Sequence, residues 1–121
     1  MSKFLRALIL ACSVGLVLPG EAAAELSATD FLRKYDSATG KVKAIYLQYL
    51  NGNANGLSWA NTYVGGNYPQ ARFYCPPNKL VPTAKLHVAL LRRFLAKAAK
   101  FRTAPVGAAM MFALKDRWPC R

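Results

Sequence analysis

The sequence has few acidic side chains for its length. Its 121 residues include 5 Asp and Glu against 17 Lys and Arg, which gives a formal net charge of +12 at pH 7. Many hydrolases need a pair of carboxylates for acid–base chemistry, and so small a supply of acids makes such a pair hard to assemble. The charge favours acidic partners, such as a protein surface or anionic lipid.

Histidine, cysteine and phosphate-binding glycine motifs are also scarce. His87 is the single histidine, and a lone histidine in an amphipathic segment is typical of packing or of surface. A metal site of three or four ligands is hard to build from this inventory. The Gly65–Gly66 pair lacks the Lys-Ser/Thr that completes a phosphate loop. We therefore expect a protein that is not an enzyme and needs neither cofactor nor metal.

No apolar run reaches the roughly 20 residues that a permanent membrane span requires. The uncharged run Ala7–Leu18 follows two basic residues and precedes three consecutive alanines, which is the order of a secretory signal. We expect residues 1–24 to be a signal peptide cleaved after Ala24, with a retained membrane anchor as the alternative. Residues 25–121 then form one exported domain.

Two cysteines remain after this cleavage, Cys75 and Cys120. An even pair in an oxidising compartment is typical of a disulfide. A bridge between them closes a loop of about 46 residues, which stabilises the fold by about 4 kcal/mol in the chain-entropy model. A redox-active pair is the weaker alternative, since the Cys-x-x-Cys spacing is absent.

Apolar residues recur with helical spacing in four segments, so the sequence predicts an all-α bundle of about four helices. Ser27 and Asp30 form a capping box at the start of the first. The second and third helices are expected over 41–64 and 83–102. A fourth is expected from Pro105 onward, with Thr103 as a candidate cap. Residues 65–83 are rich in proline and glycine and are expected to form a loop.

The second expected helix has a stripe of apolar and small residues. Gly52 and Gly56 lie on this stripe, four residues apart, and each costs about 1 kcal/mol relative to alanine in a helix interior. Close packing of another helix at these glycines would offset that loss. A helix break at Asn51–Asn53 is the alternative. The stripe consists of Val42, Ile45, Tyr49, Gly52, Gly56, Ala60 and Tyr63.

The third expected helix is amphipathic and strongly basic, with no acid within it. Its polar side includes Arg92, Arg93 and Lys97. A basic face of this kind either docks on an acidic partner or is simply solvated. Nucleic acid is not expected as a partner, because no recognition motif is present. A membrane surface is less favoured, because the apolar side of the helix has other helices to pack against.

Three motifs resemble the Rap/Tai family of type VI secretion immunity proteins. They are Tyr49-Leu50-Asn51-Gly52 with Gly56, the loop Cys75-Pro76-Pro77, and the ending Trp118-Pro119-Cys120. The resemblance implies a small helical periplasmic protein, similar in fold to HdeA-like proteins, that blocks the cleft of an injected peptidoglycan amidase and can form a homodimer. Tyr35 and Tyr46 stand where many members have a second cysteine pair.

We therefore expect a periplasmic immunity-type protein that sterically occludes an amidase with an acidic surface. The candidate contacts are Tyr68 and Arg72 in the loop, together with Arg92, Arg93 and Lys97 on the basic helix. A periplasmic chaperone similar to HdeA is one rival. A basic protein that binds anionic envelope components is the other. Five aromatic residues lie in and around the loop, and they either pack there or bind a partner. They are Trp59, Tyr63, Tyr68, Phe73 and Tyr74.

Overall fold

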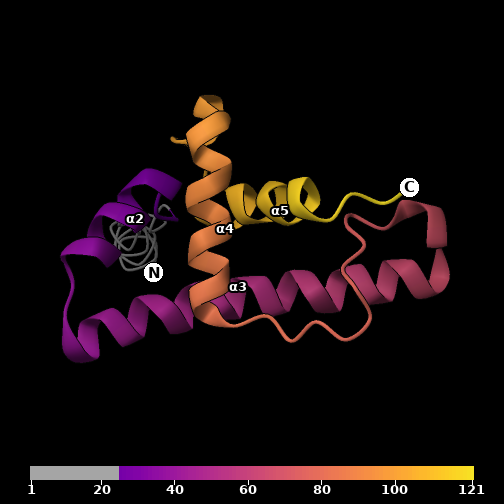
Figure 1. Cartoon of the computed structure of the whole chain (residues 1–121), viewed down its shortest axis with the longest axis horizontal. Coiled ribbons are helices and arrows are strands. Elements are labelled where there is room, and N and C mark those ends of the chain that lie inside the picture. Colours follow the sequence, from indigo (N-terminus) through magenta and orange to yellow (C-terminus); the bar gives the residue numbers. More distant parts are fainter. Residues whose placement is uncertain (1–24) are drawn as a thin grey trace, which may run out of the picture.

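The computed structural model describes residues 25–121, and the expected signal peptide lies outside this range. Four α-helices and two short 3-10 helices make up the described chain, as expected for an all-α bundle (Figure 1). They are α2 (Ala28–Ser37), α3 (Gly40–Asn67), η1 (Pro69–Ala71), α4 (Ala84–Lys97), η2 (Ala99–Phe101) and α5 (Val106–Arg117). None of the helices between residues 25 and 121 has the length and apolarity needed to cross a membrane.

Side-chain caps fix the starts of α2 and α4. The Ser27 hydroxyl accepts a hydrogen bond from the Asp30 backbone N–H at 3.1 Å and donates to the Asp30 carboxylate at 2.8 Å. The Thr83 hydroxyl accepts from the Leu86 N–H at 3.2 Å. Each cap satisfies a backbone donor that a helix start leaves without a partner. The helix start predicted at Ser27 is thus confirmed, and the Asp30 carboxylate accepts from the Ser27 hydroxyl rather than from its backbone N–H.

The boundaries of the last two helices differ from the sequence prediction. Helix α4 ends at Lys97 rather than near 102, because the chain tightens into η2. Pro105, not Thr103, is the N-cap of α5. The Val106 N–H donates to the Leu26 carbonyl at 2.9 Å, and the Gly107 N–H donates to the Glu25 carboxylate at 2.9 Å. The segment before α2 therefore caps α5.

Helix α3 lies along the long axis of the molecule, and α4 and α5 pack on one side of it (Figure 1). It is unbroken at Asn51–Asn53. Gly40, with φ of +52°, makes the turn from α2 into α3 in the left-handed region that glycine tolerates. The buried core joins all four α-helices, and its largest fully buried side chains are Phe31, Leu50, Leu91, Val106, Met110 and Leu114.

The loop after η1 is fastened at two points. Asn61 of α3 is buried; its amide donates to the Tyr74 carbonyl at 2.8 Å and its oxygen accepts from the Phe73 N–H at 2.8 Å. The expected disulfide joins Cys75 to Cys120, with the Cα atoms 5.0 Å apart. These two fastenings hold the long loop against α3 and the end of α5.

Candidate protein-binding surfaces

A groove between α2 and α4 brings together three basic side chains and an apolar floor. It has a volume of about 550 Å³, and Lys85, Arg92 and Arg93 line it with Tyr35. The remaining lining residues are Val88, Ala89 and Ala96. Lys85 and Arg92 lie seven residues apart on α4, which is about two turns and brings them to the same face, and Arg93 follows Arg92 directly. The groove can hold an apolar side chain while its cations contact a carboxylate.

Arg92 and Asp36 form a two-pronged ion pair at the edge of this groove. Two guanidinium nitrogens donate to the two carboxylate oxygens, at 2.7 and 3.0 Å. These hydrogen bonds lower the pKa of Asp36 and raise the pKa of Arg92. Both side chains are about half exposed, so the pair stabilises the fold only slightly. It does, however, hold the Arg92 guanidinium in one orientation.

Every acidic side chain of the described chain is already engaged within the chain. Asp30 pairs with Arg33 at 2.6 Å, and Asp116 pairs with Lys97 at 2.7 Å. Asp36 is bound to Arg92, and Glu25 accepts from the Gly107 N–H. Lys85 and Arg93 have no ion-pair partner within residues 25–121. Of the basic candidates, Arg93 is therefore available in full, whereas Arg92 and Lys97 each already contact a carboxylate.

Tyr68 and Arg72 lie apart from the basic groove. They flank η1 at the far end of α3, while the basic residues lie on α4, which crosses α3 near its middle (Figure 1). Tyr68 is 62% exposed. The Arg72 side chain lies directly over Gly65, where any side chain larger than hydrogen would collide with it. The five candidate contacts therefore form two separate groups rather than one surface.

The apolar stripe of α3 points outward, which corrects the prediction of close helix packing at its glycines. A Cβ atom added at Gly52 or at Gly56 would meet nothing within 4 Å. The core side of α3 is the opposite face, formed by Leu50, Ala54 and Asn61. The error arose because α3 is apolar on two faces, so that periodicity alone could not tell which one is buried.

Five of the nine large exposed apolar side chains among residues 25–121 lie on this outward face. Trp59 is 76% exposed, Tyr63 72%, and Ile45 62%. Of the aromatic group predicted around the loop, Tyr74 is buried against Trp118, whereas Trp59, Tyr63 and Tyr68 face solvent. Phe73, at 37% exposed, lies between the two cases, so core packing explains Tyr74 and not the three tyrosine and tryptophan side chains that face solvent. The exposed three are of the residue types that dominate binding energy at protein interfaces.

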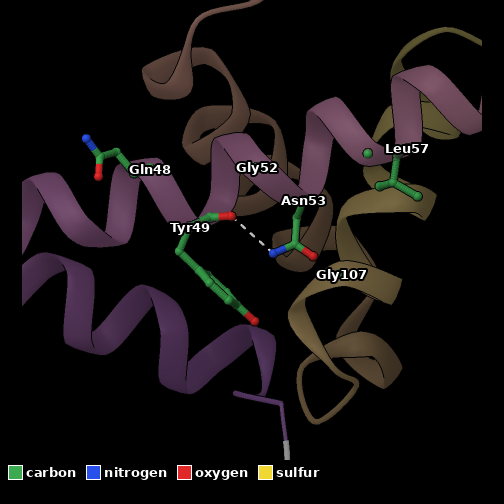
Figure 2. Close-up of a pocket in the computed structure, with 7 residues that line it drawn as sticks. Gln48, Tyr49, Gly52, Asn53, Leu57 and Gly107 are labelled. Carbon is green, nitrogen blue, oxygen red and sulfur yellow. Dashed lines mark hydrogen bonds between the residues drawn. The ribbon is translucent and has the colours of Figure 1, made fainter.

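A groove opens beside the two glycines, between α3 and the start of α5 (Figure 2). The Asn53 amide donates to the Tyr49 carbonyl at 3.1 Å, and the Tyr49 hydroxyl donates to the Glu25 carboxylate at 3.3 Å. Burial and the Glu25 charge both raise the pKa of Tyr49. A Cβ atom added at Gly107 would lie 2.9 Å from side-chain oxygens of Asn53 and Glu25, so these two side chains would have to shift to admit it.

His87 is buried in α4 beside a small closed cavity of about 110 Å³. Its Nδ1 atom has no hydrogen-bond partner in the described chain. Burial lowers the pKa of His87, because the charged imidazolium would lose its hydration. The expectation that this histidine belongs to packing is confirmed.

Sequence reasoning missed the residues that complete these surfaces. Tyr35 and Asp36 come from α2, more than fifty residues before Arg92, and no local pattern links them to it. The sequence alone gave Asn61 no assigned role. A signal was present for Asn61, since a single amide inside an apolar helical face needs a partner.

The fold and its surfaces define a small all-α protein with one disulfide, a basic groove and an outward apolar helix face. Within residues 25–121 no group of three or more His, Cys, Asp or Glu side chains is placed to hold a metal ion. No protein-family model, curated protein or solved structure matches the chain.

Proposed function

We propose that the protein is a periplasmic binding protein of the immunity type, which occludes the active-site cleft of a peptidoglycan amidase from a competing cell. The observation that carries this proposal is the groove between α2 and α4, with an apolar floor and the cations Lys85, Arg92 and Arg93. The resemblance of the Cys-Pro-Pro loop and the Pro-Cys ending to the Rap/Tai family supports the choice of target.

Charge supports a protein partner with an acidic surface. Each acidic side chain of residues 25–121 already forms an ion pair or accepts a hydrogen bond within the chain. The basic side chains that remain unpaired therefore give the surface a net positive charge. Such a field speeds the encounter with an acidic protein and suppresses binding to basic ones. An acidic loop of the amidase with one apolar side chain would fit the groove. Its apolar side chain would pack on Val88 and Ala89, and its carboxylates would pair with Lys85 and Arg93.

Occlusion of this kind requires no chemistry from the chain itself. An inhibitor that fills a cleft needs a rigid surface of the right shape. Helix α4 provides rigidity, since five of its apolar side chains and His87 are buried against the rest of the bundle. The bidentate Asp36–Arg92 pair further fixes one wall of the groove. The proposed mechanism is therefore steric, with electrostatic attraction guiding the approach.

A charge-reversal pair with a matched control tests the proposal. The protein is first purified from exporting cells at low salt, and co-purifying proteins are identified by mass spectrometry. Purified peptidoglycan amidases are then assayed with and without it. We expect the double variant K85E/R93E to weaken inhibition at least about tenfold. The control K41E/K79E changes the net charge equally, at exposed sites away from the groove, and should keep inhibition within about threefold.

Two outcomes would contradict the proposal. If both double variants lose inhibition equally, net charge and not the groove determines binding. If no amidase is inhibited and the protein instead binds vesicles of anionic lipid with steep salt dependence, the protein is an envelope-binding protein.

A further inference from the structure

A carboxylate of the chain itself already occupies a binding position at the edge of the basic groove. Two guanidinium nitrogens of Arg92 donate to the two oxygens of Asp36, at 2.7 and 3.0 Å. The fork of an arginine binds a carboxylate in this two-pronged way, whether the carboxylate belongs to the same chain or to a partner. Arg92 also lines the groove. The contact therefore shows which chemical group this wall of the groove binds.

The Asp36 contact differs from the other ion pairs of residues 25–121. Asp30 and Arg33 lie three residues apart on α2, where the helix itself brings them together. Asp116 meets the single ammonium group of Lys97. Asp36 instead reaches from the last turn of α2 to α4, 56 residues further along the chain, and takes up two donor nitrogens.

The contact between Asp36 and Arg92 can be exchanged at little cost. The Arg92 side chain is 52% exposed and that of Asp36 is 49% exposed, so water and a partner reach both, and a pair this exposed stabilises the fold only slightly. A second cation, Lys43, lies close enough for its charge to lower the pKa of Asp36. Asp36 would therefore remain near positive charge and water after leaving Arg92.

We propose that Asp36 is a placeholder, which a carboxylate of the partner displaces from Arg92 when the partner enters the groove. This exchange rests on the proposed function, since it concerns the same groove. It also names the group recognised there, the side-chain carboxylate of an Asp or Glu of the partner. Until the exchange, the placeholder keeps the guanidinium in the orientation that binds a carboxylate.

The placeholder determines which partners the groove accepts. An isolated acidic side chain that meets Arg92 must compete with Asp36, which has a high effective concentration because it belongs to the same chain. A partner gains over Asp36 when it also contacts the rest of the groove, with a second carboxylate on Lys85 or Arg93 and an apolar side chain on Val88. Specificity of this kind arises because weaker ligands are penalised. The groove therefore selects a segment of acidic, apolar and acidic residues.

A short peptide tests the exchange directly. The probe is the capped peptide Gly-Glu-Leu-Glu-Gly, and the neutral peptide Gly-Gln-Leu-Gln-Gly is the ligand control. NMR at low salt follows the Nε–H signal of Arg92 and the carboxyl carbon of Asp36. The acidic peptide should shift both signals, because the Asp36 carboxylate leaves the guanidinium, and the neutral peptide should shift neither. Binding of the acidic peptide without a shift at the Asp36 carboxyl would overturn the proposal.

Removal of the placeholder charge gives the second measure. Asp36→Asn should tighten binding of the acidic peptide about threefold, because no carboxylate competes for Arg92. Asp116→Asn changes the net charge equally and frees Lys97, which does not line the groove, so it should change the affinity by less than about 1.5-fold. Asp36→Glu keeps a carboxylate and should bind as the wild type does. Equal tightening by Asp36→Asn and Asp116→Asn would mean that net charge alone acts, and would refute the exchange.

A folding control and the amidase assay complete the test. The melting temperature of Asp36→Asn should lie within about 4 °C of the wild type, since the lost pair is exposed. Stronger amidase inhibition by Asp36→Asn, without change in Asp116→Asn, would support the exchange. An amidase inhibited equally by the wild type and by Asp36→Asn would leave the proposed function standing and overturn the exchange alone. If the acidic peptide at millimolar concentration binds neither the wild type nor Asp36→Asn, the exchange is also overturned, whatever the amidase assay shows.

Discussion

Helices α3 and α4 expose opposite kinds of surface. Helix α4 buries its apolar side, including Leu90, Leu91 and Phe94, and turns its basic side chains to solvent. Helix α3 buries a narrow side and turns Ile45 and Trp59 outward, without any charge beyond its first turn. The two helices thus suit partners of different chemistry. The basic side of α4 suits an acidic surface, and the outward side of α3 suits an apolar one.

The contrast has a physical origin in what each helix packs against. Helix α4 crosses the bundle and contacts both α3 and α5, so its apolar residues have neighbours within the chain. Helix α3 is the longest helix and has its partners on one side only (Figure 1). An exposed apolar strip of this length is typical of an interaction site. The two helices therefore differ both in amphipathic pattern and in how much of their apolar surface the rest of the chain covers.

The largest expected effect comes from truncating matched aliphatic residues on the two helices. Leu91 of α4 is fully buried, so Leu91→Ala should lower the free energy of unfolding by about 3 kcal/mol. Ile45 of α3 is 62% exposed, so Ile45→Ala should change it by less than about 0.5 kcal/mol. Urea denaturation followed by circular dichroism measures both.

The two variants must be compared at low protein concentration. Association stabilises the folded state by mass action, so both variants are measured at the lowest concentration that gives a usable signal. Equal losses for Leu91→Ala and Ile45→Ala under that condition would mean that the outer face of α3 is covered within the single chain.

The sequence predicted the fold well where one physical signal acted alone. The Ser27 capping box, the disulfide between Cys75 and Cys120, and the amphipathic pattern of α4 each led to the correct element. The outward side of α3 was read wrongly, because the apolar stripe and the core-facing residues repeat with the same period. Only the positions of α4 and α5 decide which of the two is buried.

The candidate surfaces were predictable in part. A pattern along one helix identified Arg92 and Arg93, since an all-basic polar side is visible in sequence. It could not reveal that Asp36 pairs with Arg92 or that Asp116 pairs with Lys97, because both acids lie on other helices. Nor could it show that Tyr68 and Arg72 belong to a different end of the molecule. Such relations depend on tertiary contacts between distant segments.

A smaller effect is expected from the single buried amide of α3. Asn61 bonds the backbone of Phe73 and Tyr74, so Asn61→Ala leaves those buried groups without partners. We expect a loss of about 2 kcal/mol in the free energy of unfolding. Asn55→Ala, on the exposed side of the same helix, should be nearly neutral. Hydrogen exchange at Phe73 and Tyr74 should rise only in Asn61→Ala. An unchanged rate would show that the disulfide and the hydrogen bond from the Cys75 N–H to the Trp118 carbonyl are enough to hold the loop.

The smallest effect concerns pH and brings the comparison back to α4. Because burial lowers the pKa of His87, the unfolded chain takes up a proton near pH 6.5 before the folded chain does. Stability should therefore fall as pH decreases below about 6.5. The cavity beside His87 has one other titratable group, Tyr74, whose pKa burial raises, so it stays neutral throughout this range.

His87→Leu isolates this contribution, because it keeps an apolar side chain at the site and removes the titrating group. Between pH 8 and about pH 5 the variant should lose less unfolding free energy than the wild type. At lower pH both should decline together, since their ion pairs lower the pKa of Asp30 and of Asp36 and these stabilising charges are lost by protonation below the ordinary aspartate range. If the two pH profiles were parallel above pH 5, His87 would be hydrated in solution, and the acid sensitivity of the protein would lie in its surface ion pairs alone.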